Sequence, residues 1–182
     1  MASAKKKLLL HTCCGVCGSW IAEKLSKDYD VTIYFYNPNI YPEDEYKRRR
    51  DASQAVAESL GIGFIEGEYS PGGWFEGVRG LEQEPEGGNR CCVCFDYRLE
   101  RTARYAKENN FNAFATTLTI GRNKRADVIN PIGDQWAKQY GLKFVGGDWK
   151  KEGGQVETDK KSQELGIYRQ NYCGCKYSIR SS

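Results

Sequence analysis

The cysteines are the residues of this chain whose type and spacing suggest chemistry. Three lie in residues 13–17 (CCGVC), three in residues 91–94 (CCVC) and two in residues 173–175 (CGC). Thiolates bind zinc, single iron ions and iron–sulfur clusters. Eight thiols exceed the four ligands of one structural zinc site or one 4Fe–4S cluster. The pattern predicts a metal centre with more than one metal, or with a spare reactive thiol.

The local geometry of each group adds detail. Cys91 and Cys94 are three residues apart at the start of a predicted helix, so they share a face near amides that favour thiolates. The last pair flanks Gly174 and lies on one side of an extended chain. Side chains of the adjacent Cys13 and Cys14 are expected to diverge and so to serve two neighbouring metals.

Composition favours a reducing compartment. The start of the chain holds only three consecutive leucines, short of the roughly 7–15 apolar residues of a secretory signal. No stretch approaches the roughly 18 apolar residues of a membrane span. We therefore expect a cytoplasmic protein without a membrane partner, in which the thiols stay reduced. We also expect it to be a monomer. A length of 182 residues fits one domain over residues 1–182, and a net charge of +3 permits a nucleic-acid partner if the basic residues cluster.

Predicted strands and helices alternate along the chain. Strands are expected at residues 6–11, 31–36, 63–66, 113–118 and 142–145, and helices at 18–27, 42–60, 91–109, 123–140 and 158–165. Residues 70–89 are expected to be irregular. This order predicts an open parallel α/β sheet of about five strands flanked by helices, with right-handed crossovers. Ligands of such sheets bind beyond the carboxyl ends of the strands, where the first cysteine group would lie.

Further motifs surround the cysteines. They are His11-Thr12-Cys13-Cys14, Tyr36-Asn37-Pro38-Asn39 with Glu45-Tyr46 and Arg49, Glu84-Pro85-Glu86-Gly87 before Arg90-Cys91, Arg98-Leu99 with Thr102-Ala103, Thr116-Thr117-Leu118, and Tyr168-Arg169-Gln170-Asn171-Tyr172-Cys173-Gly174-Cys175. With them the chain resembles the QueH family of epoxyqueuosine reductases over nearly its whole length. The resemblance implies a Rossmann-like (HUP-type) iron–sulfur catalytic domain. It also implies a 4Fe–4S cluster beside a single iron ion, and deoxygenation of epoxyqueuosine to queuosine at the wobble position of tRNA without cobalamin.

Four positions depart from the family pattern. Cys17 stands where the family can have Asp, and either side chain can bind iron. Cys92 has no clear family counterpart and is not expected to be a ligand. Gly15 and Val16 replace the more usual Ala-Pro.

Seven thiols therefore remain as ligands. One division places Cys14, Cys91, Cys94 and Cys173 on the cluster and Cys13, Cys17 and Cys175 on the single iron. That iron would keep an open position and polarise the epoxide oxygen. The cluster would pass on electrons from a ferredoxin or flavodoxin.

Proton donors and substrate contacts are also expected. His11 and Tyr172 are the candidate proton donors, with Asp96 weaker. Alternatively, His11 is a buried residue that orients the cysteine loop. The residues expected to bind substrate are Tyr36, Asn37, Asn39, Arg49, Arg122 and Gln170. Either asparagine could equally serve only the turn that contains it.

Binding of tRNA would use basic and aromatic side chains. Basic residues cluster at 47–50, 122–125, 150–151 and 160–161 and could contact phosphate, although residues 47–50 could also be a solvated helix face. Exposed aromatic residues such as Tyr36, Tyr41 or Trp74 could stack on an anticodon base.

Two other functions share some of these features. A PP-loop tRNA-modifying enzyme would need an SGGxDS-like phosphate loop after the first strand, where this chain has residues 11–19 (HTCCGVCGS) instead. A zinc-stabilised tRNA-binding protein would carry the thiols without redox chemistry.

Overall fold

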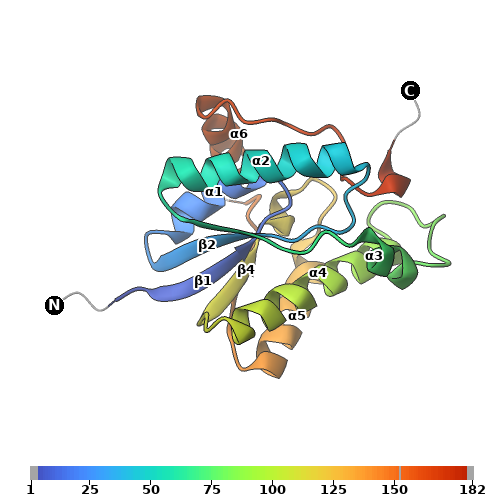
Figure 1. Cartoon of the computed structure of the whole chain (residues 1–182), viewed down its shortest axis with the longest axis horizontal. Coiled ribbons are helices and arrows are strands. Elements are labelled where there is room, and N and C mark those ends of the chain that lie inside the picture. Colours follow the sequence, from blue (N-terminus) through green and yellow to red (C-terminus); the bar gives the residue numbers. More distant parts are fainter. Residues whose placement is uncertain (1–3, 152, 180–182) are drawn as a thin grey trace.

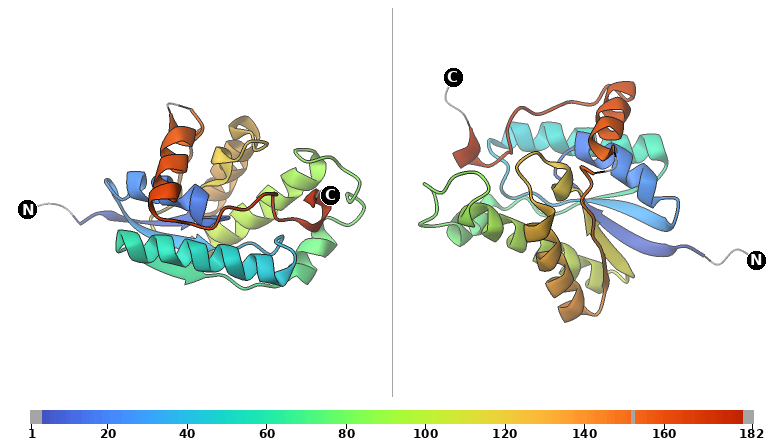
Figure 2. Two further views of the ribbon diagram at one scale, coloured as in Figure 1. Left: turned by 90° about the horizontal axis from the view of Figure 1, so that it is seen from above. Right: turned by 180° about the vertical axis from the view of Figure 1, so that it is seen from behind.

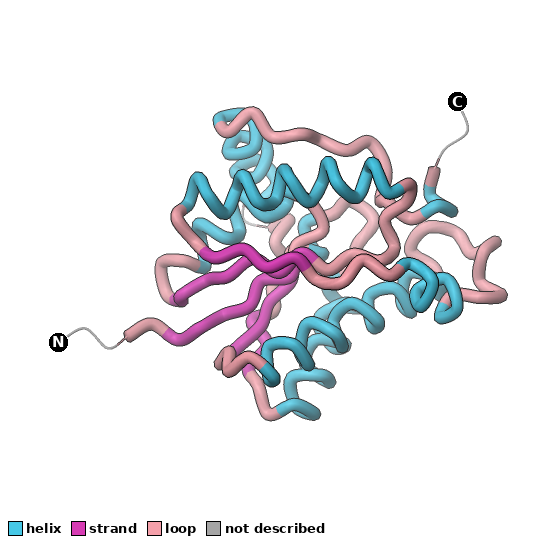
Figure 3. Tube along the Cα trace, in the orientation of Figure 1, coloured by secondary structure: helices cyan, strands magenta, loops and turns pink. Residues whose placement is uncertain are grey.

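The computed structural model describes residues 4–151 and 153–179. Its centre is a five-stranded parallel sheet in the order β3-β2-β1-β4-β5 (Figures 1 and 3). The strands are β1 (Lys6–His11), β2 (Tyr29–Phe35), β3 (Gly63–Glu66), β4 (Ala113–Thr116) and β5 (Lys143–Val145). The helices are α1 (Gly15–Leu25), α2 (Glu43–Leu60), α3 (Pro71–Gly77), α4 (Asn89–Glu108), α5 (Ala126–Tyr140) and α6 (Gly154–Glu164), with short 3-10 turns η1 (Leu118–Ile120) and η2 (Lys176–Ser178). The predicted open parallel α/β sheet is confirmed.

Apolar side chains of the central strand divide the core into two layers. Leu8 and Leu10 are fully buried against α1 and α2, whereas Leu9 is fully buried against α4 and α5. This follows from the two-residue repeat of a strand, which points neighbouring side chains to opposite faces. Figures 1 and 2 show α1, α2 and α6 on one face of the sheet and α4 and α5 on the other.

Several element boundaries differ from the predicted ones, and three of these matter for the site. Helix α1 begins at Gly15 rather than at residue 18, so the first cysteine group forms its first turn. Residues 70–89 are not all irregular, because α3 begins with Pro71, a residue whose fixed φ suits a first helical turn. Helix α6 begins at Gly154 rather than at residue 158.

Three segments converge beyond the carboxyl ends of β1 and β4. His11 ends β1 and lies beside Thr116, the last residue of β4. The direction in which successive strands are added to the sheet reverses between β1 and β4. The carboxyl ends of these two strands are therefore the expected ligand site of an open α/β sheet. The tail that follows α6 returns past the start of α2 to the same edge, where the Tyr41 amide donates to the Gly174 carbonyl at 2.8 Å (Figure 2).

In the described part of the chain, no helix is both long and apolar enough to cross a membrane.

Helices α1 and α2 meet so closely at Gly15 that a side chain would not fit. A Cβ atom there would lie 2.7 Å from the Ala52 carbonyl oxygen of α2. This contact gives a reason for glycine at this position. We expect Gly15→Ala to lower the free energy of unfolding by about 1–3 kcal/mol, as overpacking does.

Thermal or denaturant unfolding measures this effect, and Gly72→Ala is the matched control, since a Cβ at Gly72 meets nothing within 4 Å. If Gly15→Ala were as stable as the parent chain, the close approach of the two helices would be wrong.

Candidate metal centre

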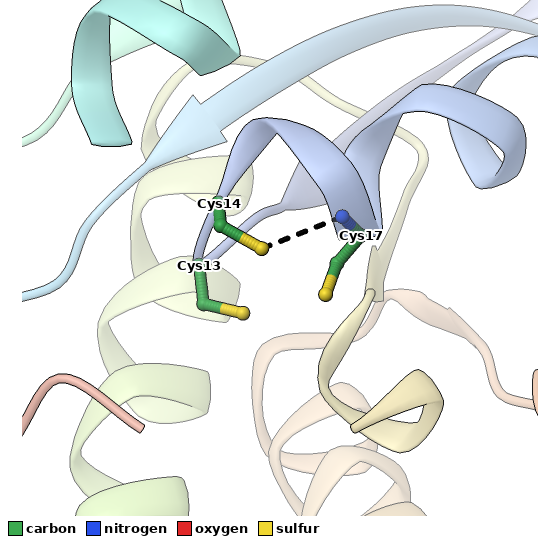
Figure 4. Close-up of side chains that lie close together, drawn as sticks. All are labelled: Cys13, Cys14 and Cys17. Carbon is green, nitrogen blue, oxygen red and sulfur yellow. Dashed lines mark hydrogen bonds between the residues drawn. The ribbon is translucent and has the colours of Figure 1, made fainter. Parts of the chain in front are cut away.

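The first cysteine group is compact. The sulfur atoms of Cys13, Cys14 and Cys17 all lie within 4.8 Å of one another, and Figure 4 shows them around a common space. Cys14 is the extended N-cap residue of α1, and its sulfur accepts the Cys17 amide at 3.4 Å. The expected divergence of Cys13 and Cys14 is wrong, because the chain enters α1 directly at Gly15 and turns both side chains toward Cys17.

Neighbouring groups lower the pKa of one thiol in this cluster, which favours metal binding. Hydrogen bonds from the thiols of Cys14 and Cys17 hold the pKa of Cys13 well below its usual range, against the effect of burial. Donating to Cys13 raises the pKa of Cys14 to about 12. The Lys124 ammonium lies 3.9 Å from the Cys13 sulfur. The neighbouring thiols and the Lys124 ammonium thus favour the thiolate form of Cys13, and a metal ion bound by all three sulfurs would release the protons of Cys14 and Cys17.

The second group contains four thiols. Cys91, Cys94, Cys173 and Cys175 line one small cavity, with Trp74 of α3 over it. Cys91 and Cys94 face this cavity from the first turns of α4, in line with the face they were predicted to share. The Arg98 guanidinium donates to the Cys94 sulfur at 3.6 Å. A fixed cation beside these sulfurs suits a negatively charged centre.

Arg49 holds the tail that carries the last two cysteines. Its guanidinium donates to the carbonyls of Cys173 at 2.9 Å and Tyr172 at 3.0 Å, and to the Glu45 carboxylate at 2.7 Å. Gly174 lies against it with φ +117°, where a Cβ would be 2.9 Å from the Arg49 Nη1 atom. Arg49 is 1% exposed. Arg49 was predicted to bind substrate, and in the structure its hydrogen bonds go to groups of the protein itself.

A large cavity of about 700 Å³ opens beside both thiol groups. Cys13, Cys17 and Cys173 line it. The predicted Arg122, Gln170 and Tyr172 also line it, together with Arg49, Lys124, Lys150, Arg169 and the α6 residues Gln155, Thr158 and Asp159. Basic side chains therefore predominate around an opening next to the sulfurs, as an anionic substrate would require.

Of the basic clusters at 47–50 and 160–161, only Arg49 lines the large cavity. Lys47 pairs with Glu43 at 3.0 Å, and Lys161 pairs with Glu23 at 2.8 Å. Lys47 is half exposed on α2, which agrees with the alternative of a solvated helix face.

Two aromatic residues predicted to be exposed are buried. Tyr36 is 7% exposed and stacks between Tyr34 and Tyr97, while Trp74 is 1% exposed over the second thiol group. Their exposure was wrongly predicted, because large aromatic surfaces here complete the core. Tyr41 is 42% exposed, as expected.

Both predicted asparagines are buried too. Asn37 donates to the Thr12 carbonyl at 2.8 Å and accepts from Arg98 at 2.9 Å. Asn39 is 2% exposed within the turn. The bonds of Asn37 favour the alternative in which it shapes the turn beside the cysteine loop. The side-chain oxygen of Asn39 is buried without a hydrogen bond among the described residues, so its predicted role stays a prediction.

His11 is fully buried and its two ring nitrogens are occupied. Because a carbonyl only accepts, Nε2 donates to the Tyr36 carbonyl at 3.1 Å, so Nδ1 accepts from the Thr116 hydroxyl at 2.9 Å. Burial, followed by the nearby Arg98 charge, lowers the pKa of His11 to about 3. The ring is therefore neutral and offers no free proton, which favours the orienting role over that of proton donor.

The remaining candidates have clear positions. The Asp96 carboxylate accepts from the Trp136 indole at 2.9 Å, so it is engaged away from the thiols. Tyr172 lines the large cavity and its hydroxyl donates to the Tyr41 carbonyl. Cys92 lines neither cavity described above. Sequence reasoning missed Arg98 as a partner of Cys94, although their four-residue spacing on a helix was the available signal.

The chain matches known proteins along almost all of its length. The family model for Epoxyqueuosine reductase QueH matches residues 8–181. The chain belongs to the QueH family. Relatives named epoxyqueuosine reductase QueH are 41% identical in Streptococcus pyogenes (98% of this chain, 72% of the relative), 42% in Acinetobacter baylyi (97% and 82%) and 37% in Thermotoga maritima (94% and 90%). The predicted family and its oxidoreductase class are confirmed.

A solved structure has the same fold as this QueH family member. It is the U34-tRNA thiolase NcsA from Methanococcus maripaludis with its [4Fe-4S] cluster, with a TM-score of 0.61 and 14% identity. The match covers 98% of this chain and 63% of that one. At this identity the likeness establishes the fold alone, and it agrees with the predicted HUP-type sheet.

Proposed function

We propose that the chain reduces epoxyqueuosine to queuosine at the wobble position of tRNA. Membership of the QueH family carries this proposal, and the basic cavity beside two thiol groups supports it. The reaction takes up two electrons and two protons, breaks both C–O bonds of the epoxide, and leaves the cyclopentene of queuosine and one water molecule.

The donor set fits iron–sulfur chemistry. A 4Fe–4S cluster is commonly held by four cysteine thiolates, and the second group supplies four around one cavity. We infer that Cys91, Cys94, Cys173 and Cys175 hold the cluster. The first group has three thiols and faces the large cavity, as suits a single ion with an open position. This division exchanges the places that the sequence suggested for Cys14 and Cys175.

Bound in these two groups, the metals would supply electrons and Lewis-acid activation of the epoxide oxygen. The protein's own residues position the groups around them. His11 fixes the end of β1, two residues before Cys13, through its bonds to β4 and to the Tyr36 carbonyl. Lys124 and Arg98 place fixed positive charge beside the sulfurs. Tyr172 stays the proposed proton donor, since it lines the cavity, and to act it would exchange its bond to the Tyr41 carbonyl for one to the substrate.

The proposed partners are tRNA and an electron-donor protein. Arg122, Lys124 and Lys150 form the basic wall that we assign to the phosphates near the anticodon. A ferredoxin or flavodoxin stays the proposed electron donor, and a cytoplasmic monomer stays the proposed form of the protein.

Metal analysis and turnover test the proposal. The protein is purified without air, and iron, sulfide and zinc are measured with the visible spectrum. We expect about five irons to four sulfides, and conversion of epoxyqueuosine-containing tRNA to queuosine-containing tRNA with a chemical reductant. Zinc without sulfide would instead favour the zinc-stabilised tRNA-binding protein, and iron–sulfur content without turnover would contradict the assigned reaction.

A further inference from the structure

Two buried polar atoms, on residues that line the large cavity, have no hydrogen-bond partner among the described residues. They are the hydroxyl oxygen of Thr158 and the side-chain carbonyl oxygen of Gln170, both buried and without a hydrogen bond among the described residues. Thr158 is 1% exposed, and both residues line the large cavity. A buried unpaired polar group costs about 1–3 kcal/mol, and among the described residues these are the two with such an atom that also line the large cavity.

The two atoms belong to one rigid wall. Helix α6, which carries Thr158, packs against α1, which carries Cys17. The guanidinium of Arg169, next to Gln170, donates to Asp159 at 2.5 Å and to Ser162 at 3.2 Å. These bonds fix the tail to α6, so Thr158 and Gln170 belong to two segments that are joined beside the cavity they both line.

The chemistry of the atoms selects the kind of ligand group. A hydroxyl can pair with either end of the Gln170 amide, whereas a phosphate oxygen can pair only with its nitrogen. A threonine hydroxyl can also pair with a hydroxyl in either direction. Epoxyqueuosine carries two hydroxyls on the cyclopentane ring that bears the epoxide. The epoxide has to approach the thiols, and Cys13 and Cys17 line the same cavity.

We propose that Thr158 and Gln170 bind the cyclopentanediol of epoxyqueuosine and so orient its epoxide toward the metal centre. This inference rests on the proposed function. It makes α6 a specificity element, because a substrate without the ring hydroxyls would leave two buried polar groups unpaired.

Binding of two tRNAs tests this assignment in the holoenzyme. One carries epoxyqueuosine, and the other carries 7-aminomethyl-7-deazaguanine, which has the same base and amine but no cyclopentane ring. We expect Thr158→Val to weaken binding of the first about tenfold and to leave binding of the second unchanged. Thr158→Ser, which keeps the hydroxyl, should restore binding, and Gln170→Met should repeat the loss.

Stability gives a second readout that needs no substrate. Valine has the shape of threonine, so removing an unpaired hydroxyl should leave the melting temperature unchanged or raise it. A lower melting temperature would mean that the hydroxyl has a partner within the protein and would overturn the proposal. Metal content should stay that of the parent chain.

The control is Thr117→Val, which removes another buried hydroxyl without a partner among the described residues, but one outside the cavity lining. It should bind both tRNAs normally. If Thr158→Val weakened binding of both tRNAs equally, Thr158 would contact the base that they share, and the diol assignment would be overturned. Turnover by the parent chain distinguishes failure of the proposed function from failure of the diol assignment. If the parent chain does not convert epoxyqueuosine-containing tRNA, the proposed function is wrong. If it does, and Thr158→Val binds both tRNAs like the parent chain, only the diol assignment is wrong.

Discussion

Cys94→Ser should remove sulfide and visible absorption from the purified protein, whereas Cys92→Ser should keep both. Cys94 is 7% exposed in the cavity of the second thiol group, next to Arg98, while Cys92 lies on the same turn and outside that cavity. A serine oxygen is a poor ligand for an iron–sulfur cluster, which thiolates hold. Reductase activity of Cys94→Ser should fall by at least ~10², since even outer-shell changes at metal sites cost 10–100-fold.

The first group should respond differently. Cys14→Ser should lose about one iron per chain and keep its sulfide and its spectrum, because its sulfur lies with those of Cys13 and Cys17. Activity should be lost in both variants, so metal and sulfide content separate the groups. If Cys14→Ser lost sulfide and Cys175→Ser kept it, the division suggested by the sequence would be the right one.

Much of the fold follows from local pattern. The five strands are apolar or β-branched and alternate with helices, and a parallel sheet is the arrangement that buries both faces of such strands. The boundaries that sequence reasoning missed lie at glycine-rich segments. Helix α6 begins at Gly154, where a Cβ would meet the Trp149 carbonyl, and local propensity does not contain that contact.

The site was predictable in its members and less so in its arrangement. Residue type and spacing identified the thiols, and chain order placed the first group at the carboxyl end of β1. The grouping of Cys14 with Cys13 depends on the residue at which α1 begins. The position of Lys124 beside Cys13 joins residues 111 positions apart, which no local pattern contains.

Arg49 shows the same limit, and its substitution is the second large effect we expect. Its guanidinium joins α2 to two carbonyls more than 120 positions away in the sequence. The guanidinium carbon also lies over the Tyr172 ring, 5.1 Å from the ring centroid. Arg49→Lys keeps the charge but replaces a planar fork by a single ammonium. We expect the free energy of unfolding to fall by about 1–3 kcal/mol, and the sulfide content to fall because Cys173 and Cys175 are no longer held in place.

Arg48→Lys is the matched control on the same helix. The Arg48 side chain is 58% exposed, so the change should alter stability by no more than about 0.5 kcal/mol. The alternative role of Arg49, contact with a tRNA phosphate, makes the opposite prediction. In that case Arg49→Lys would keep stability and sulfide, while affinity for tRNA and its dependence on salt would both decrease. Unfolding, sulfide content and salt-dependent tRNA binding of the two variants therefore decide whether Arg49 holds the tail or contacts the substrate.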